Sequence, residues 1–399
     1  MKPGLLNWFY LFMNHLHQAF SVRFTYTVFF TERLFDPTNS LLADFFKQQT
    51  HDQIRKKLLF ILDSGVTATH ANLQADITNY FAQHADLIEF IPDQLIIPGG
   101  EGAKNNPDFV EQIVDAVDRH GIDRHSFVVA LGGGSLLDLV GYATAISHRG
   151  IRHIRIPTTV LSQNDSGVGV KNGVNYRGKK NFLGTFVPPV AVFNDSQFLT
   201  TLDERDWRAG ISEAIKVALI KDALFFDWIE AHAEQLAARD MSAMNYLIHR
   251  CAQMHLDHIA GGDPFEMGSS RPLDFGHWSA HKLEQLTNFE LRHGEAVAIG
   301  IALDTLYSQQ LGWLTIADAN RVLNVLHTLG FTLYQPMLDH NNGEGLLKGL
   351  AEFREHLGGQ LTIMLLQAIG RGVEVHEMDA NRVRQAIRAL RESELSAIS

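Results

Sequence analysis

Histidines and carboxylates recur on apolar segments in the second half of the chain. His277 and His281 stand four residues apart in DFGHWSAHKLE, so one helical face would point both side chains at a single ligand. Glu213 and Lys216 lie three apart in AGISEAIKVALI, and His293 opens the apolar run HGEAVAIGIAL. A carboxylate with two imidazoles suits a catalytic zinc that keeps an open position. None of these segments has the HExxH pattern, so spacing alone leaves three alternatives for the histidine pair: a metal pair, one ligand with one substrate contact, or surface residues.

Two further histidines and the single cysteine are expected to be ordinary surface or core residues. His255 and His258 in QMHLDHIAGG are helix-spaced and are expected to face solvent. Cys251 is the single cysteine, which excludes an internal disulfide and a cysteine-based zinc site and fits a reducing cytoplasm. We expect Cys251 to be a buried small apolar residue.

The segment VVALGGGSLLDLVGYA is typical of a strand, a tight glycine turn and a helix. Gly133 and Gly134 would let backbone N–H groups approach a diphosphate at the positive end of that helix. The pattern is not GxGxxG, so glycines needed only for the turn are the alternative. Asp138 is either a first-turn acid or a cofactor contact. Asp63 closes the apolar strand LLFILD, where an acid commonly holds a ribose hydroxyl, although it could be an ordinary turn aspartate.

The densest polar segment is RIPTTVLSQNDSGVGVKNGVNYRGKKNFLGTF. Its polar residues include Thr158, Thr159, Asp165, Lys171, Lys180 and Asn181. They stand among glycines and small residues, so the backbone could fold closely round a ligand, and the lysines offer mobile charges for phosphate. The alternative is a solvated loop, since few of these residues could build a core.

Two kinds of hydrophobic pattern divide the chain. In the first half, short apolar runs such as KLLFILD, SFVVALG, IRHIRIP and VAVFND alternate with amphipathic stretches, which predicts a parallel sheet covered by helices. After about residue 199 apolar residues recur at three and four, which predicts a helical domain. We therefore predict an N-terminal extension at 1–22, an α/β domain at 23–198 and an all-α domain at 199–399.

Charge and hydropathy restrict the partners. The formal net charge is −11 and the pI is about 6.0, which argues against a general nucleic-acid binder. The apolar run in MKPGLLNWFYLFM is too short to span a bilayer, and no other segment is apolar for long enough. We expect a cytoplasmic protein without membrane or nucleic-acid partners.

The order of motifs carries more information than any one of them. GGGSLLD, RGI, PTT, GKKN, TLDERD, GISEAIK, FGHWSAH and HGEAV, in this order, resemble the 3-dehydroquinate synthase family of sugar-phosphate cyclases, from about Asp63 to Gly370. The resemblance implies a Rossmann-like NAD-binding domain, a helical metal-binding domain, an active site in the cleft between them and a homodimer.

The resemblance also assigns roles residue by residue. It implies a cofactor set of Asp63, Glu101, Lys104, Gly133, Gly134, Asp138, Thr158, Thr159, Lys180 and Thr201. It implies Glu213, His277 and His293 as ligands of zinc, with cobalt as an alternative metal. The expected catalytic residues are Asp165, Lys171, Lys216 and His281, and the expected substrate contacts are Arg149, Asn181, Arg271 and Asp274, with Arg149 reaching the partner subunit's site.

The implied chemistry accounts for this inventory. Zinc lowers the pKa of a sugar hydroxyl so that hydride can pass to NAD+, and the resulting ketone acidifies the neighbouring C–H and permits phosphate elimination. Hydride then returns, the ring opens, and the enolate closes to a carbocycle with no net redox change. The expected substrate is a seven-carbon ketose phosphate.

Departures from the family pattern concern the substrate. Asp274 replaces an asparagine before FGH, Arg271 lies one residue closer to His277, and a lysine expected near Leu256 is absent. These positions handle the carboxylate of the usual keto acid, which Asp274 would repel. RPLDFGH is similar instead to related cyclases acting on sedoheptulose 7-phosphate, so this sugar is the alternative substrate.

Two other functions fit part of the pattern. Iron- or zinc-dependent polyol dehydrogenases share a GGGS-x-x-D turn, NAD and a helical metal domain, but they would produce NADH and release no phosphate. An NAD-binding scaffold without catalysis would fail to bind zinc.

Overall fold

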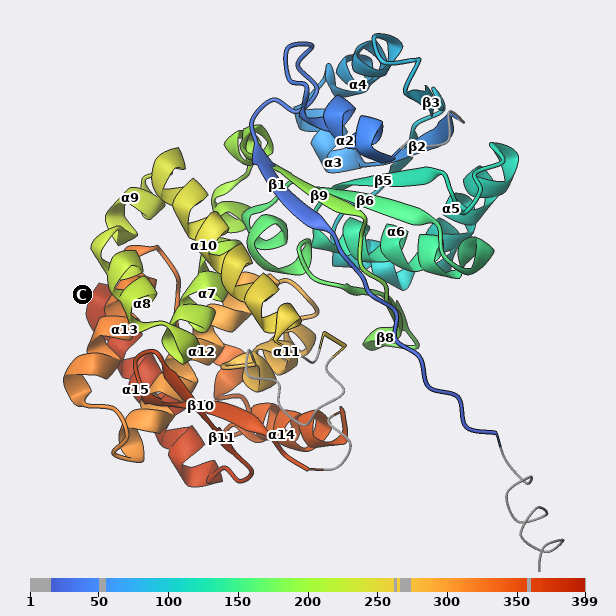
Figure 1. Ribbon diagram of the computed structural model, residues 1–399. Helices are drawn as coiled ribbons and strands as arrows, with labels where there is room; N and C mark the ends of the chain where they lie inside the picture. The colour runs from blue at the N-terminus through green and yellow to red at the C-terminus, as the bar shows by residue number, and fades with distance from the viewer. Residues whose placement is uncertain (1–15, 50–54, 262–263, 266–273, 357–359, 399) are drawn as a thin grey trace, which may run out of the picture.

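The computed structural model describes residues 16–49, 55–261, 264–265, 274–356 and 360–398. It has an N-terminal part built on a sheet and a mostly helical C-terminal part, which lie side by side (Figure 1). In the part of the chain that the structure describes, no helix is both long and apolar enough to cross a membrane.

A parallel sheet forms the centre of the N-terminal part. Its strands are β1 (Thr27–Thr31), β2 (Lys56–Asp63), β3 (Ile88–Phe90), β4 (Leu95–Ile97), β5 (Phe127–Gly132), β6 (Arg152–Pro157) and β9 (Ala191–Asp195). The order is β1-β9-β6-β5-β2-β3, with β4 also paired to β2, and every pairing is parallel. All residues of β5 are buried, as expected for a strand covered on both faces. The predicted parallel α/β fold is confirmed.

Helices cover both faces of the sheet (Figure 1). Leu58, Phe60 and Leu62 of β2 pack into the same core as α2 (Leu41–Gln49) and α4 (Leu73–Ala82). Leu59 and Ile61 point the other way, toward α5 (Pro107–Arg119) and α6 (Gly134–Ile146). The alternation follows from the two-residue period of a strand, and it makes the sheet a rigid floor for the loops at its edge.

Short helical turns carry many of the polar residues next to this sheet. They are α3 (Ser64–Thr69), η1 (Glu101–Asn105), η2 (Ser147–Arg149), η3 (Ser162–Ser166) and η4 (Ser196–Thr201). Because parallel strands all end at one edge, the turns that follow β2, β5, β6 and β9 gather there. The predicted domain boundary between residues 198 and 199 falls within η4.

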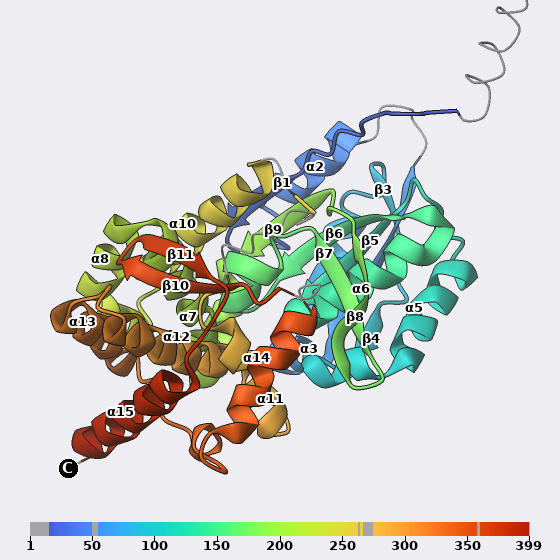
Figure 2. The same cartoon turned by 90° about the horizontal axis from the view of Figure 1, so that it is seen from below.

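A hairpin stands apart from the sheet. Strands β7 (Lys171–Tyr176) and β8 (Lys179–Phe186) pair antiparallel around a two-residue turn, Arg177 and Gly178, which both have positive φ. The sequence predicted only a polar loop here. The hairpin packs on α6 and lies on the side facing the helical part (Figure 2).

The C-terminal part has one continuous hydrophobic core. Its elements are α7 (Glu204–Lys221), α8 (Ala223–Ala231), α9 (Ala233–Ala237), α10 (Met241–Ala260), α11 (His277–Leu286), α12 (His293–Gln310), α13 (Ile316–Thr328), η5 (Pro336–Leu338), α14 (Glu344–His356), β10 (Ile363–Ala368), β11 (Arg371–Val375) and α15 (Ala380–Ile398). The predicted helical domain is confirmed as mostly helical. It departs from all-α in one feature, the β10–β11 hairpin.

Candidate active site

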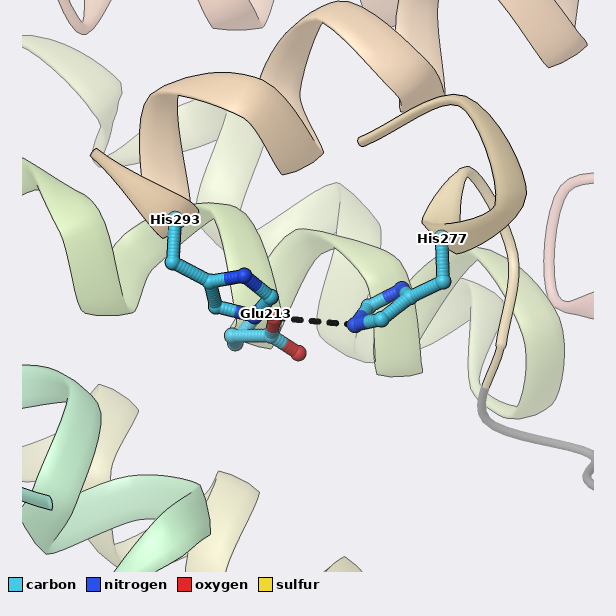
Figure 3. A group of neighbouring side chains, drawn as sticks. All are labelled: Glu213, His277 and His293. Atoms are coloured by element: carbon cyan, nitrogen blue, oxygen red, sulfur yellow. Dashed lines mark ion pairs between the residues drawn. The ribbon is translucent and has the colours of Figure 1, made fainter. Parts of the chain in front are cut away.

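Three side chains from three helices meet in the C-terminal part. Glu213 projects from α7, while His277 and His293 are the first residues of α11 and α12. The Nε2 atoms of His277 and His293 lie 3.5 and 3.4 Å from Glu213 Oε1. Figure 3 shows the carboxylate between the two imidazole rings. The ligand atoms all lie within 4.8 Å of one another, so one ion could contact all three.

The charge state and bonding of Glu213 fit a metal. Its side chain is buried, and Oε1 accepts no hydrogen bond from any described residue. Burial raises the pKa of Glu213, but Lys216 and His277 outweigh burial and hold it well below the usual range. Lys216 pairs with Oε2, which leaves Oε1 as the buried oxygen that the two imidazoles face, and one carboxylate with two imidazoles is a zinc-type ligand set.

A close contact between α11 and α12 fixes His277. Gly276, just before His277, has a φ of 77°, and a Cβ there would stand 2.6 Å from the backbone nitrogen of Ile301. The buried carboxylate of Asp304 on α12 accepts from Gly276 N at 3.1 Å and from Trp278 Nε1 at 3.0 Å. Donors on both sides of His277 are thus tied to α12.

His281 lies beside this group without contacting Glu213. Its ring centroid is 5.4 Å from that of His277 and 5.9 Å from that of His293. Burial, with His277 as the next cause, holds the pKa of His281 well below its usual range. The structure therefore groups His277 and His293 with Glu213, and places His281 one turn further along α11.

Lys216 is surrounded by carboxylates. It is buried and pairs with Glu213 one turn earlier on α7. Burial lowers the pKa of Lys216, but the charges of Glu213, Asp165 and, to a smaller extent, Asp274 outweigh burial and raise it. The ammonium is therefore a fixed positive charge between three acids.

His255 corrects one expectation. Its Nδ1 lies 2.7 Å from Asp165 Oδ1, joining α10 to η3 across the two parts of the molecule. Burial raises the pKa of Asp165, but the hydrogen bond and charge of His255 lower it further. His255 is half-buried and paired with Asp165, so the prediction that it faces solvent is wrong. His258 is also half-buried but lies at the surface, 3.4 Å from Lys221 Nζ. Helix spacing could not show that the face of α10 carrying His255 packs on η3.

A buried arginine on β6 fixes the loop that carries Asp165. Arg155 on β6 donates to the carbonyl oxygens of Gly167, Gly169 and Lys171 at 3.0, 2.8 and 2.9 Å. Burial lowers the pKa of Arg155 to about 10. The segment predicted as a ligand-binding or solvated loop is therefore a fixed structure between η3 and β7.

The expected cofactor residues gather at the carboxyl edge of the sheet. Asp63 ends β2, is buried, and accepts from Gly65 N at 2.8 Å as the cap of α3. A Cβ on Gly99 would lie 2.1 Å from Asp63 Oδ2, and one on Gly132 would lie 2.9 Å from Asp63 Cβ. Burial raises the pKa of Asp63. Glycines thus bring three backbone segments close around this carboxylate, while Gly133 is the N-cap of α6.

Lys104 joins another part of the cofactor set. It is 3% exposed, and its Nζ lies 2.8 Å from Asp138 Oδ2 and 3.9 Å from Glu101 Oε1. Asn181 Oδ1 also accepts from Lys104. Burial lowers the pKa of Lys104, but Asp138 and Glu101 outweigh it and raise the pKa. Residues distant in sequence are thus bonded together near the start of α6.

The predicted threonines lie on two turns at the same edge. Thr158 is buried, and its N–H donates to the carbonyl of Gly132 at 3.1 Å, which ties β6 to the glycine turn. Thr159 Oγ1 lies 2.8 Å from Ser162 Oγ. Thr201 Oγ1 lies 2.9 Å from His70 Nε2, next to η4.

Comparison with known proteins decides the family. A profile described as 3-dehydroquinate synthase N-terminal matches residues 94–209, and one described as 3-dehydroquinate synthase C-terminal matches residues 210–348. The chain is 37% identical to the 3-dehydroquinate synthase of Nitrosococcus oceani over 295 residues, which are 74% of this chain and 81% of that protein. The chain belongs to the 3-dehydroquinate synthase family.

Other members of the family, and solved structures, show the same likeness. The 3-dehydroquinate synthase of a Ruegeria species is 36% identical over 84% of this chain and 88% of its own. The structure of ValA, a 2-epi-5-epi-valiolone synthase from Streptomyces hygroscopicus with NAD+ and Zn2+ bound, is 32% identical and has a TM-score of 0.85 over 95% of this chain and 100% of that one. A 2-deoxy-scyllo-inosose synthase structure, at 21% identity and a TM-score of 0.74 over 91% and 96%, shows the shared fold.

The other site residues expected from the family pattern lie at several different places in the structure. Lys171 on β7 and Arg149 after α6 are exposed, and Arg149 has a φ of 63°. Asp274 is half-buried just before α11, and Arg271 lies outside the described residues. Lys180, expected in the cofactor set, lies 3.1 Å from Glu284 Oε1 on α11.

Sequence reasoning also missed Glu284 and Asp304. Glu284 Oε2 lies 3.2 Å from His293 Nδ1, and Asp304 fastens the turn before His277. Glu284 had a signal in the sequence, because His277, His281 and Glu284 have the i, i+4, i+7 spacing of one helical face. Asp304 had none, since its partners depend on how α11 crosses α12.

Proposed function

We propose that the protein is an NAD- and metal-dependent sugar-phosphate cyclase, which converts a seven-carbon ketose phosphate into a carbocycle with elimination of phosphate. The observation that supports this best is the group of Glu213, His277 and His293, with its buried and donor-free carboxylate oxygen. We infer a divalent metal, Zn2+ or Co2+, at these residues and NAD at the carboxyl edge of the sheet. ValA carries NAD+ and Zn2+, and the inosose synthase carries NAD+ and Co2+.

The residues fit this chemistry. The metal would acidify a sugar hydroxyl, and NAD would accept and return one hydride. Lys216 offers a fixed positive charge beside the metal ligands, while Lys171 and Asn181 on the hairpin strands would hold the phosphate. His281 would contact the same phosphate, and Asp165 would orient the sugar next to Lys216. Arg271 completes the proposed substrate contacts.

We propose sedoheptulose 7-phosphate as the sugar. Lys216 lies among Glu213, Asp165 and Asp274, so the nearby acids outnumber this ammonium. A substrate carboxylate brought to this region would meet like charges in a buried site, where repulsion is weakly screened. A sugar without a carboxylate avoids that repulsion. The likeness to ValA, at 32% identity, is compatible with a family member other than a 3-dehydroquinate synthase, while the identities to 3-dehydroquinate synthases are 36 and 37%.

A two-substrate assay tests both the cyclase reaction and the choice of substrate. Purified protein with NAD+ and Zn2+ is incubated with sedoheptulose 7-phosphate or with 3-deoxy-arabino-heptulosonate 7-phosphate, and inorganic phosphate is measured. We expect release from the first alone, without accumulation of NADH. Release from the second alone would reverse the substrate assignment. Accumulating NADH without phosphate would indicate a polyol dehydrogenase, and no reaction with either sugar would refute the cyclase.

The environment of the protein is also a proposal. We infer a cytoplasmic enzyme, because a single buried cysteine, Cys251, fits a reducing compartment. We further propose a homodimer, because Arg149 is exposed and the family resemblance implies that it reaches the partner's site. No nucleic-acid or membrane partner is proposed.

A further inference from the structure

Glu284 contacts both parts of the molecule at once. It lies on α11 and is only 4% exposed. Its Oε2 is 3.2 Å from His293 Nδ1. Its two oxygens are 3.1 and 3.3 Å from Lys180 Nζ, which comes from β8. One buried carboxylate therefore joins a metal-ligand histidine to a lysine on the hairpin.

The contact with His293 selects which nitrogen faces a metal. A neutral imidazole carries one proton, and an acceptor at Nδ1 keeps the proton there. The lone pair of Nε2 is then directed toward Glu213, whose Oε1 is 3.4 Å away. A carboxylate in this place fixes both the tautomer and the ring orientation of a metal ligand.

The ion pair with Lys180 gives Glu284 a second role, which is structural. His281, Glu284 and His293 also lie close enough to hold an ion, but the Lys180 ammonium already neutralises both oxygens of Glu284. We therefore do not assign a second metal to them. Lys180 stands two residues after the tight turn of the β7–β8 hairpin, so its ion pair fastens the hairpin end to α11.

We propose that Glu284 is a positioning residue that couples the metal site to the β7–β8 hairpin. It holds His293 for the metal and, through Lys180, holds the hairpin against the helical domain. Metal binding that fixes His293 then also orders the hairpin, and this coupling is reciprocal. The inference rests on the metal site of the proposed function, but it does not depend on which sugar is the substrate.

Metal affinity tests the first contact. Zn2+ affinity is measured by competition with a chelator, and the Co2+ absorption spectrum reports the ligand geometry, with NAD+ saturating throughout. For Glu284→Gln we expect the Zn2+ Kd to rise about 10- to 100-fold, with altered Co2+ bands. Glu284→Asp keeps the charge but shortens the side chain, so it should also bind Zn2+ more weakly.

A matched control is available in an ion pair between α11 and α14. Glu352 pairs with Lys282 of α11 at 2.6 Å, and Glu352→Gln removes that ion pair away from the metal ligands. This variant should keep the Zn2+ Kd within about twofold, because exposed ion pairs contribute little. Circular dichroism confirms that each variant is folded.

Hydrogen exchange tests the second contact. In the wild type, Zn2+ should slow exchange of the β7–β8 amides. Lys180→Met should still bind Zn2+ but lose this metal-dependent protection, and Glu284→Gln should lose it even at saturating Zn2+. An unchanged Kd in Glu284→Gln, or protection that persists in Lys180→Met or is absent from the wild type, would overturn the proposal.

Neither measurement uses a sugar phosphate. A chain that shows the coupling and releases no phosphate would therefore refute the cyclase while leaving the role of Glu284 intact. Phosphate release without the coupling would do the reverse.

Discussion

The imidazole groups near Glu213 differ in what they can contact, although two of them share one helical face. His277 and His293 both face Oε1 of Glu213, whereas His281 lies against their rings. Sequence spacing could not separate these roles. The separation comes from α7, which brings Glu213 to the first residue of α11 and not to its second turn.

Alanine at each of the two α11 histidines should therefore have a different effect. His277→Ala removes a ligand and should weaken Zn2+ binding by at least about 100-fold. His281→Ala should keep the Zn2+ Kd and lose most of the phosphate release. Metal titration and turnover of both variants provide the check, and equal loss of metal in both would contradict the assignment.

Asp304 should make stability depend on pH. Burial raises the pKa of Asp304 from 3.8 to about 7, so the folded state binds its proton more tightly than the unfolded state. Stability from this group is fully present below about pH 4 and is lost as pH rises to about 7, by about 4 kcal/mol at most. Urea unfolding followed by tryptophan fluorescence should show this fall in the wild type. Asp304→Asn cannot titrate, so an unchanged slope in this variant would contradict the prediction.

At the scale of elements, the candidate metal site depends on the close crossing of α11 and α12. Gly276 is needed there for two reasons: its φ is positive, and a Cβ would meet the α12 backbone. Such a crossing places the first residues of both helices beside α7. A local change in this turn should therefore affect both stability and metal binding.

Comparing Gly276→Ala with alanine at a second glycine should separate the effect of the positive φ from the effect of the missing space for a Cβ. Gly312 has a similar φ of 76°, but no described atom lies within 4 Å of a Cβ there. We expect Gly312→Ala to cost about 1 kcal/mol from backbone strain alone, and Gly276→Ala to cost at least about 2 kcal/mol. Urea unfolding and Zn2+ titration measure the difference. Equal costs and unchanged Zn2+ binding would show that the crossing tolerates a methyl group.

At the scale of the whole molecule, the candidate site spans both domains. Asp165 with His255, and Lys180 with Glu284, pair residues from the sheet part with residues from the helical part. Neither part alone holds the candidate metal ligands, the expected cofactor residues and the hairpin. In the proposed dimer, the exposed Arg149 of one subunit would also contribute to the site of the partner subunit.

Subunit complementation tests the proposed role of Arg149. Arg149→Ala and His277→Ala should each be inactive, since one lacks the residue offered to the partner and the other lacks a metal ligand. Co-expressed as differently tagged subunits, they form mixed dimers with one intact site in two, so a random mixture should recover about a quarter of wild-type activity. Purified mixed dimers without activity would show that Arg149 acts within its own subunit.

Much of the fold, and the candidate metal group of Glu213, His277 and His293, followed from the sequence. Apolar strands such as LLFILD and VVALG predicted the parallel sheet, because burial on both faces demands continuous hydrophobic runs. The edge strand β1 and both hairpins were not predicted. They are partly exposed, so their pairing depends on neighbours and not on a local pattern.

The sequence by itself determined the chemical inventory, the family motifs and the helical faces that carry Glu213, His277 and His293. Only the tertiary structure decided that His255 meets Asp165, that Asp304 braces the turn before His277, and that Glu284 joins His293 to Lys180. The physical reason is the same in each case. These contacts are made between elements distant in the chain, and a side chain's partner across such a contact depends on how the elements cross and not on the spacing within either one.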